Sequence, residues 1–270
     1  MTEPVTRCTP GAPCWVSLLV HGLEASQEFY HELFGWEYRT GAGATGPYSR
    51  AVLDGCEVAG IGQVPPRRQL PVAWLPYLAT DDTDSTAELV RMCGGTVGVG
   101  PLEVEGTARV AVASDPSGAA FGIRQSDAYT GAHPGGGPGT VVWNELITHQ
   151  ASTVEKFYRT VFGLDAEPAT ENRSGSAEGS GDGEEFDHIT LKANGRAVGG
   201  VHGVGTALPR DRGAHWLMYV EVADTDAAAR RVSELGGRVL RPPYDSPHGR
   251  VARVADREGA PFAVIRPATG

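Results

Sequence analysis

The sequence predicts an α+β fold built from two similar modules in tandem, each a mixed sheet with helices packed against it. A stretch that reads as strand, turn and amphipathic helix at residues 14–36 occurs again at 142–164. Trp15 and Trp143, the first matched pair, are separated by 128 residues, and the later matched positions keep that offset. An internal repeat of this length within 270 residues indicates two domains of one architecture.

The order of elements after the repeated stretch is also the same in both halves. Alternation of apolar residues predicts the first strand, and apolar residues at helical spacing predict the helix that follows it. The dipeptides Asp54-Gly55 and Asn194-Gly195 favour tight hairpin turns, so a hairpin is expected in each half. Each half is therefore a βαβββ-type module with a further helix and closing strands. The later elements are a strand and a helix at 74–79 and 83–93, matched by 216–222 and 225–235, and closing strands around 115–118 and 256–259.

The composition along the chain predicts the domain boundaries. We expect an N-terminal arm at 1–12, a first module at 13–127, a Gly/Pro-rich linker at 128–139 and a second module at 140–267. The second module also contains a Gly/Ser/acidic stretch at 171–185, which is typical of a surface loop. A lid over a ligand site is the alternative interpretation of that loop.

Charge and hydropathy exclude several classes of partner. The chain has 23 basic and 33 acidic residues, a net charge of −10, and its basic residues form no run. Binding to nucleic acid or to an anionic membrane is therefore not expected. No apolar run approaches the roughly 18 residues that a membrane span needs, and the polar N-terminus does not resemble a signal peptide. The expectation is a cytoplasmic protein whose partner is a small molecule.

Both halves carry the same motifs in the same order: W-x-x-L in the first strand, FY-x-x-x-F-G in the helix, the D/N-G hairpin, a Gly-Gly pair after the second helix, and D-x-x-G-A-x-F at the end of each half. This ordered set resembles the vicinal oxygen chelate superfamily, which includes glyoxalases, extradiol dioxygenases and bleomycin-binding proteins. The resemblance covers residues 13–267 and implies a fold in which mixed sheets cup around a cleft. It does not fix the reaction, because this fold supports lyases, transferases, oxygenases and binders.

In catalytic members of that superfamily a divalent metal is held in the cup by His, Glu or Gln side chains from successive strands. Counting from the motifs places strong ligands at none of these positions in this chain. The positions are Trp15, Arg50, Leu75 and Gly122 in the first half, and Trp143, Thr190, Leu217 and Ala263 in the second. No metal is therefore expected at the family positions, and Trp15 and Trp143 are interpreted as space-filling or stacking walls.

A second set of polar residues lies one pleat from those positions, in the second half alone. Glu145, His188 and His215 are each two residues from a family position and share its strand face. Two imidazoles and one carboxylate can bind Zn, Fe, Mn or Ni, or can act as a metal-free acid–base group. The matching first-half residues are Ser17, Tyr48 and Ala73. Another histidine, His202, is placed on a return strand where it could also face the cup.

Two functions remain open from the sequence. The first is metal-independent binding of an apolar or aromatic metabolite, for sequestration, biosynthesis or a stress response, and it needs no cofactor. The alternative is a glyoxalase-like lyase, isomerase or dioxygenase that uses a divalent metal or acid–base group at Glu145, His188 and His215. The oligomeric state is expected to be a monomer or homodimer. The residues expected to line the ligand site are Trp15, Ser17, Tyr48, Arg50, Trp143, Glu145, His215 and Tyr219.

Overall fold

The structure is a computed structural model that describes residues 8–42, 47–64, 72–104, 108–126, 136–169, 188–204 and 213–268. Three expectations fall wholly or largely outside these residues: the start of the N-terminal arm, most of the linker, and the loop at 171–185. Among the described residues no helix is both long enough and apolar enough to cross a membrane.

Each half of the chain forms one eight-stranded mixed sheet, which confirms the predicted fold class and tandem arrangement. Strand order is β2-β3-β4-β1-β5-β8-β7-β6 in the first sheet and β10-β11-β12-β9-β13-β16-β15-β14 in the second. The first half consists of β1 (Pro13–Val20), α1 (Leu23–Phe34), β2 (Glu37–Ala42), β3 (Pro47–Leu53), β4 (Cys56–Gln63), β5 (Trp74–Ala79), α2 (Thr83–Met92), β6 (Thr96–Val104), β7 (Ala108–Ser114) and β8 (Ala120–Ser126). The second consists of β9 (Val141–Thr148), α3 (Ala151–Phe162), β10 (Asp165–Pro168), β11 (His188–Ala193), β12 (Arg196–Gly203), β13 (His215–Glu221), α4 (Thr225–Glu234), β14 (Arg238–Ser246), β15 (Gly249–Ala255) and β16 (Pro261–Pro267).

Each sheet is made of two βαβββ units, which meet where β1 pairs antiparallel with β5 and where β9 pairs with β13. The sequence predicted one such unit per half plus a helix and closing strands. Four strands were missed: β2, β6, β10 and β14, the outermost strand at each end of the two sheets. An outer strand pairs along one edge only and is largely exposed, so it shows little apolar alternation; in β6 and β14 the pairing register also shifts.

The predicted turns and helix ends are confirmed by the backbone. Asp54 and Asn194 both have positive φ, at 49° and 50°, and each is followed by a glycine that also has positive φ, as a tight hairpin requires. Gly35 ends α1 in the left-handed conformation at φ 74°, and its N–H bonds to the carbonyl of His31. Gly163 ends α3 in the same way.

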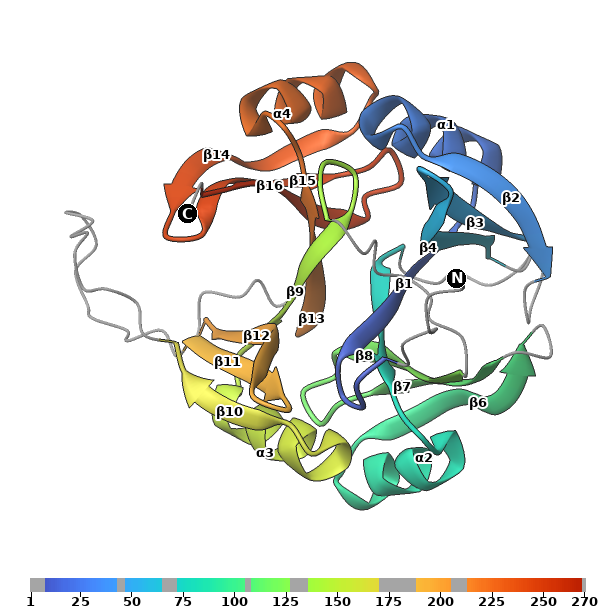
Figure 1. The fold of residues 1–270 in the computed structure, drawn as a ribbon, viewed down its shortest axis with the longest axis vertical. Helices are drawn as coiled ribbons and strands as arrows, with labels where there is room; N and C mark the ends of the chain where they lie inside the picture. Colours follow the sequence, from blue (N-terminus) through green and yellow to red (C-terminus); the bar gives the residue numbers. More distant parts are fainter. Residues whose placement is uncertain are drawn as a thin grey trace, which may run out of the picture.

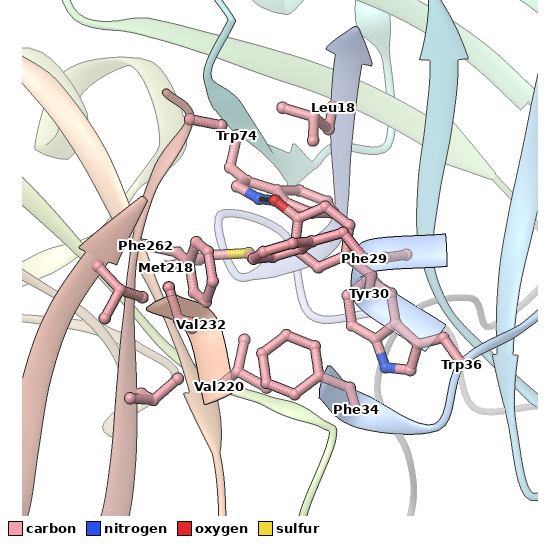
Figure 2. Packing of buried hydrophobic residues seen from close by; sticks show 14 of the residues in the cluster. Leu18, Phe29, Tyr30, Phe34, Trp36, Trp74, Met218, Val220, Val232 and Phe262 are labelled. Carbon is pink, nitrogen blue, oxygen red and sulfur yellow. Dashed lines mark hydrogen bonds between the residues drawn. The ribbon is translucent and has the colours of Figure 1, made fainter. Parts of the chain in front are cut away.

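The two halves share their hydrophobic cores. One core combines α1 and β1 of the first half with α4, β13 and β16 of the second, and the other combines α2 and β8 with α3 and β9. Figure 1 shows the consequence, with α1 beside α4 and α2 beside α3. In Figure 2, Tyr30 of α1 packs among Trp36, Trp74 and Phe262, rings that come from both halves.

Alternation along the central strands sends one set of side chains into these cores and the other set to the opposite face of each sheet. In β9, Leu146 enters a shared core, whereas Ile147 and Trp143 lie on the other face with Leu217 and Tyr219. We call that face of the second sheet the second cup. The corresponding face of the first sheet, which carries Trp15, Ser17 and Tyr77, is the first cup.

Candidate functional site

The second cup brings polar side chains together through the pairing of four adjacent strands. Glu145 of β9 is in register with Gly200 of β12 and with Leu217 of β13. One row further along, His202 of β12 is in register with Ile147 of β9 and with His188 of β11. Residues in register point to the same face, so both imidazoles share the face of Glu145.

Glu145, His188 and His202 form a compact group. One potential ligand atom from each lies within 4.8 Å of those of the other two, and all three residues are partly buried. The two imidazole rings are 3.9 Å apart between centroids and tilted by 32°. Nδ1 of His202 is 3.9 Å from Oε2 of Glu145. Two imidazoles and one carboxylate from three neighbouring strands are therefore positioned to act on one small molecule or to hold one ion.

The carboxylate of Glu145 has a defined set of partners on its other side. The Tyr219 hydroxyl donates a 2.8 Å hydrogen bond to Oε2, and the Arg253 guanidinium lies 3.8 Å from the same oxygen. Burial alone would raise the pKa of Glu145, but the interactions with His202, Tyr219 and Arg253 outweigh it and hold the pKa below its usual value. Burial raises the pKa of Tyr219, so this hydroxyl keeps its proton and serves as a donor. Glu145 is therefore an ionised carboxylate with one oxygen fixed in place.

His215, which the sequence grouped with Glu145 and His188, lies on the far side of β9 from His202. It is in register with Ile147, and its Nδ1 is 3.0 Å from the carbonyl oxygen of Gly213. Adjacent strands are about 4.8 Å apart, so His215 is roughly two strand spacings from His202. The compact group thus contains His202 where the sequence analysis placed His215. The signal for His202 was its place on a return strand facing the cup; what was lacking was the parallel pairing of β12 with β9.

Apolar side chains surround the polar group. Ile147, Leu217, Tyr219, Val251, Ala263 and Ile265 form a cluster on this face, with Trp143 and Tyr244 packed against it. The Trp143 ring lies over Gly200, where a Cβ would come 3.4 Å from ring atoms. The expected ligand-site residues Trp143, Glu145 and Tyr219 are thus brought to one face of the second sheet.

The first cup is filled by its own side chains. Trp15 is 6% exposed and donates through Nε1 to the Tyr48 hydroxyl at 3.0 Å. The Tyr48 hydroxyl occupies the place that a Cβ would need at Gly60, and the Tyr77 ring does the same at Gly122. Ser17, the counterpart of Glu145, contacts the Tyr77 hydroxyl at 3.5 Å. Trp15 and Tyr48, two of the expected ligand residues of this half, contact each other, and the position of Glu145 holds no carboxylate.

Two further expectations concern Arg50 and the tryptophan pair. Arg50, which the sequence analysis suggested for an anionic ligand, forms an ion pair of 2.7 Å with Glu57.

A cavity of about 230 Å³ lies where the starts of β1 and β9 approach each other. Both Trp15 and Trp143 line this cavity, but Glu145, His188 and His202 do not. The lining residues are Ala12, Pro13, Trp15, Val16, Val141, Val142, Trp143, Asn144, Ala197 and Val198. It is a space between the halves and separate from the polar group.

Comparison with known proteins places the chain in a family. A family model described as a glyoxalase-like domain matches residues 141–265, the half that carries the polar group. The chain belongs to the glyoxalase-like family of the vicinal oxygen chelate superfamily, since relatives with 35–36% identity extend over nearly all of it. Anthracycline biosynthesis protein DauV of Streptomyces sp. (strain C5) is 36% identical, covering 97% of this chain and 95% of that protein. Putative glyoxylase CFP32 of Mycobacterium tuberculosis is 35% identical, covering 96% and 95%.

Solved structures of low sequence identity share the fold. The Mn(II)-bound glyoxalase from Novosphingobium aromaticivorans superposes with a TM-score of 0.65 at 15% identity, covering 96% of this chain and 82% of that one. The 2,3-dioxygenase LapB from Pseudomonas sp. KL28 superposes with a TM-score of 0.63 at 14% identity, covering 97% and 93%. At this identity the likeness concerns architecture alone.

Proposed function

We propose that this chain is a small-molecule enzyme of the glyoxalase or dioxygenase type whose reacting group is Glu145, His188 and His202 in the second cup. The observation that carries the proposal is the meeting of these three side chains within 4.8 Å on one face of the sheet. Trp143 and the apolar cluster beside them suit the non-reacting part of an organic substrate. Metal-independent binding, the first expectation from the sequence, needs no such polar group and is less well supported.

The chemistry of the donor set fits a divalent metal. Two imidazole nitrogens and one carboxylate oxygen are ligands that Zn²⁺, Fe²⁺ and Mn²⁺ accept. The carboxylate of Glu145 would bind the ion together with one nitrogen each from His188 and His202. A bound ion would supply Lewis-acid polarisation of substrate oxygens, or a bound water of lowered pKa.

The protein's own residues have separable roles in this proposal. Tyr219 fixes the orientation of the Glu145 carboxylate by donating to it. In the metal-free alternative, His202, whose Nδ1 lies 3.9 Å from that carboxylate, is the side chain placed to accept or return a proton. Trp143 and Leu217 exclude water from one side of the group. The same residues would serve a metal-free acid–base enzyme, which is the second candidate.

The names of two relatives bear on the substrate. DauV and DnrV are both described as anthracycline biosynthesis proteins. Together with the aromatic side chains of the cup, this favours a flat, oxygenated aromatic metabolite as substrate of the present chain.

Metal content and turnover test the proposal together. Untagged protein, loaded in turn with Zn²⁺, Fe²⁺ and Mn²⁺, should retain about one ion per chain in at least one case. His188→Ala and His202→Ala should lose that ion, whereas His215→Ala, the matched control on the other side of β9, should keep it. Retention in all three variants would refute this metal site. The absence of a bound ion, together with no consumption of dicarbonyl or catechol substrates, would refute the proposed enzyme and favour metal-independent binding of a small molecule.

A further inference from the structure

The guanidinium of Arg253 adds a positive charge to the second cup, and it comes from a strand that carries none of the three reacting residues. It lies on β15 in register with Ala263 of β16, and Ala263 is in register with Tyr219. Arg253 therefore points to the same face as Tyr219. The small Ala263 between them leaves room for the long side chain to cross toward Glu145, and Nη2 comes within 3.8 Å of Oε2.

The guanidinium in this position is incompletely satisfied. Nε of Arg253 is buried and has no hydrogen-bond partner in the described part of the chain. At 3.8 Å the Nη2–Oε2 separation is an ion pair but exceeds hydrogen-bond distance. Arg250, three residues away on the same strand, instead donates to both oxygens of Asp226 at 2.5 and 2.9 Å. A charged N–H group without an acceptor is costly, and the Arg253 side chain remains 25% exposed, so a further acceptor can reach the guanidinium at its terminal nitrogens.

We propose that Arg253 recognises an acidic oxygen of the substrate, a carboxylate, phenolate or enolate oxygen, and so selects an anionic aromatic molecule. This inference rests on the proposed function, because it names the substrate class of the same site. The planar guanidinium donates to that oxygen, and the aromatic remainder packs on Trp143, Leu217 and Tyr219. Arg253 Nη2 and His202 Nδ1 lie 3.8 and 3.9 Å from the same Glu145 oxygen, so a substrate oxygen held by Arg253 would lie near the proposed reacting group.

The overall charge of the protein makes this local cation informative. A chain with a net charge of −10 repels anions at its surface, so an anionic substrate needs a specific cationic group. Arg241 lies in register with Arg253 on the next strand, but it is exposed and stacks over the Tyr244 ring at 3.7 Å. The two arginines therefore form a natural pair for comparison: one inside the cup and one at its rim.

Binding of two isosteric probes to the full chain tests the inference. Isothermal titration calorimetry with 2-naphthoate and with neutral 2-naphthamide should show the anion binding about tenfold or more tightly. The same preference should persist after treatment with a chelator, since it depends on Arg253 and not on an ion. Arg253→Met should abolish the preference, and Arg253→Lys should retain part of it. Arg241→Met, which removes the same charge at the rim, should leave it unchanged.

Several results would overturn the inference. An unchanged preference for the anion in Arg253→Met would show that the Arg253 guanidinium does not recognise it. An equal loss of preference in Arg241→Met would show that the preference comes from the overall charge of the protein. Because Arg253→Met leaves Glu145 without its neighbouring cation, the double variant Arg253→Met with Glu145→Gln keeps the cup neutral and should also lack the preference. The outcome is independent of metal content and turnover, so a failure here is distinguishable from a failure of the proposed reaction.

Discussion

The hydroxyl of Tyr30 donates a 2.9 Å hydrogen bond to Oδ2 of Asp256, although 226 residues separate them in the chain. Tyr30 belongs to α1 of the first half, and Asp256 to the turn between β15 and β16 of the second. The same hydroxyl accepts from Nε1 of Trp74 at 2.9 Å. Tyr158 has the equivalent bond to Asp115 at 3.2 Å, so each half inserts a helix tyrosine into the closing turn of the other. These reciprocal bonds lock the two halves together.

Removing the Tyr30 hydroxyl should destabilise the protein strongly. In Tyr30→Phe the buried carboxylate of Asp256 and the indole N–H of Trp74 lose a partner, and leaving such groups unsatisfied costs about 2–3 kcal/mol. Urea unfolding followed by circular dichroism measures the change. Tyr38→Phe is the matched control, because the Tyr38 hydroxyl is buried and has no hydrogen-bond partner in the described structure. Equal losses from both variants would contradict this account.

Asp256 should make stability depend on pH. Burial raises its pKa above the ordinary value of 3.8, so the folded protein binds the proton more tightly than the unfolded chain does. The corresponding stability is fully present below the ordinary pKa and is lost as pH rises through the raised folded value. Asp256→Asn has no proton to lose there. Wild type should therefore lose stability relative to Asp256→Asn as the pH rises above the ordinary pKa of 3.8 in urea titrations; a difference that stays constant with pH would rule out this linkage.

A methyl group at Gly60 should disturb the first cup, whereas one at the equivalent Gly200 should not disturb the second. The Tyr48 hydroxyl fills the space that a Cβ at Gly60 would take, and the same hydroxyl accepts from Trp15. At Gly200 the nearest atoms are 3.4 Å from a built Cβ. Gly60→Ala should change tryptophan fluorescence and lower stability by about 1–3 kcal/mol. Gly200→Ala should leave both nearly unchanged, and the reverse order would show that the first cup is not closed by Tyr48.

Glu258 should stabilise α1 from the opposite half. The helix begins after Gly22, which has no capping side chain, and the Glu258 carboxylate accepts from the backbone N–H groups of His21 and Gly22 at 2.7 Å each. Glu258→Ala should lower the free energy of unfolding by about 1–2 kcal/mol, because these amides lose their charged acceptor. Glu88→Ala removes only an exposed pair with Arg91 and should cost less than about 0.5 kcal/mol. Similar costs in thermal or urea unfolding would argue against the cap.

The sequence by itself determined the tandem architecture, the hairpin turns and the faces of the central strands. These depend on local chemistry: Asp54 and Asn194 before glycine select tight turns, and period-two alternation puts Glu145 and Trp143 on one face whatever the rest of the fold does. The outer strands β6 and β14 could not be predicted in this way, since exposure removes the alternation that marks a strand.

Only the tertiary structure decided which histidine joins Glu145. His202 and His215 both lie on the cup face, since each is in register with Ile147, and alternation along their strands does not distinguish them. Strand order separates them: β11 and β12 lie together on one side of β9, and β13 lies on the other. His188 and His202 therefore share a strand pairing, while His215 stands about two strand spacings from His202. The β11–β12 hairpin is local, but its position beside β9, with β13 on the other side, arises from non-local strand pairing that no local pattern in the sequence encodes.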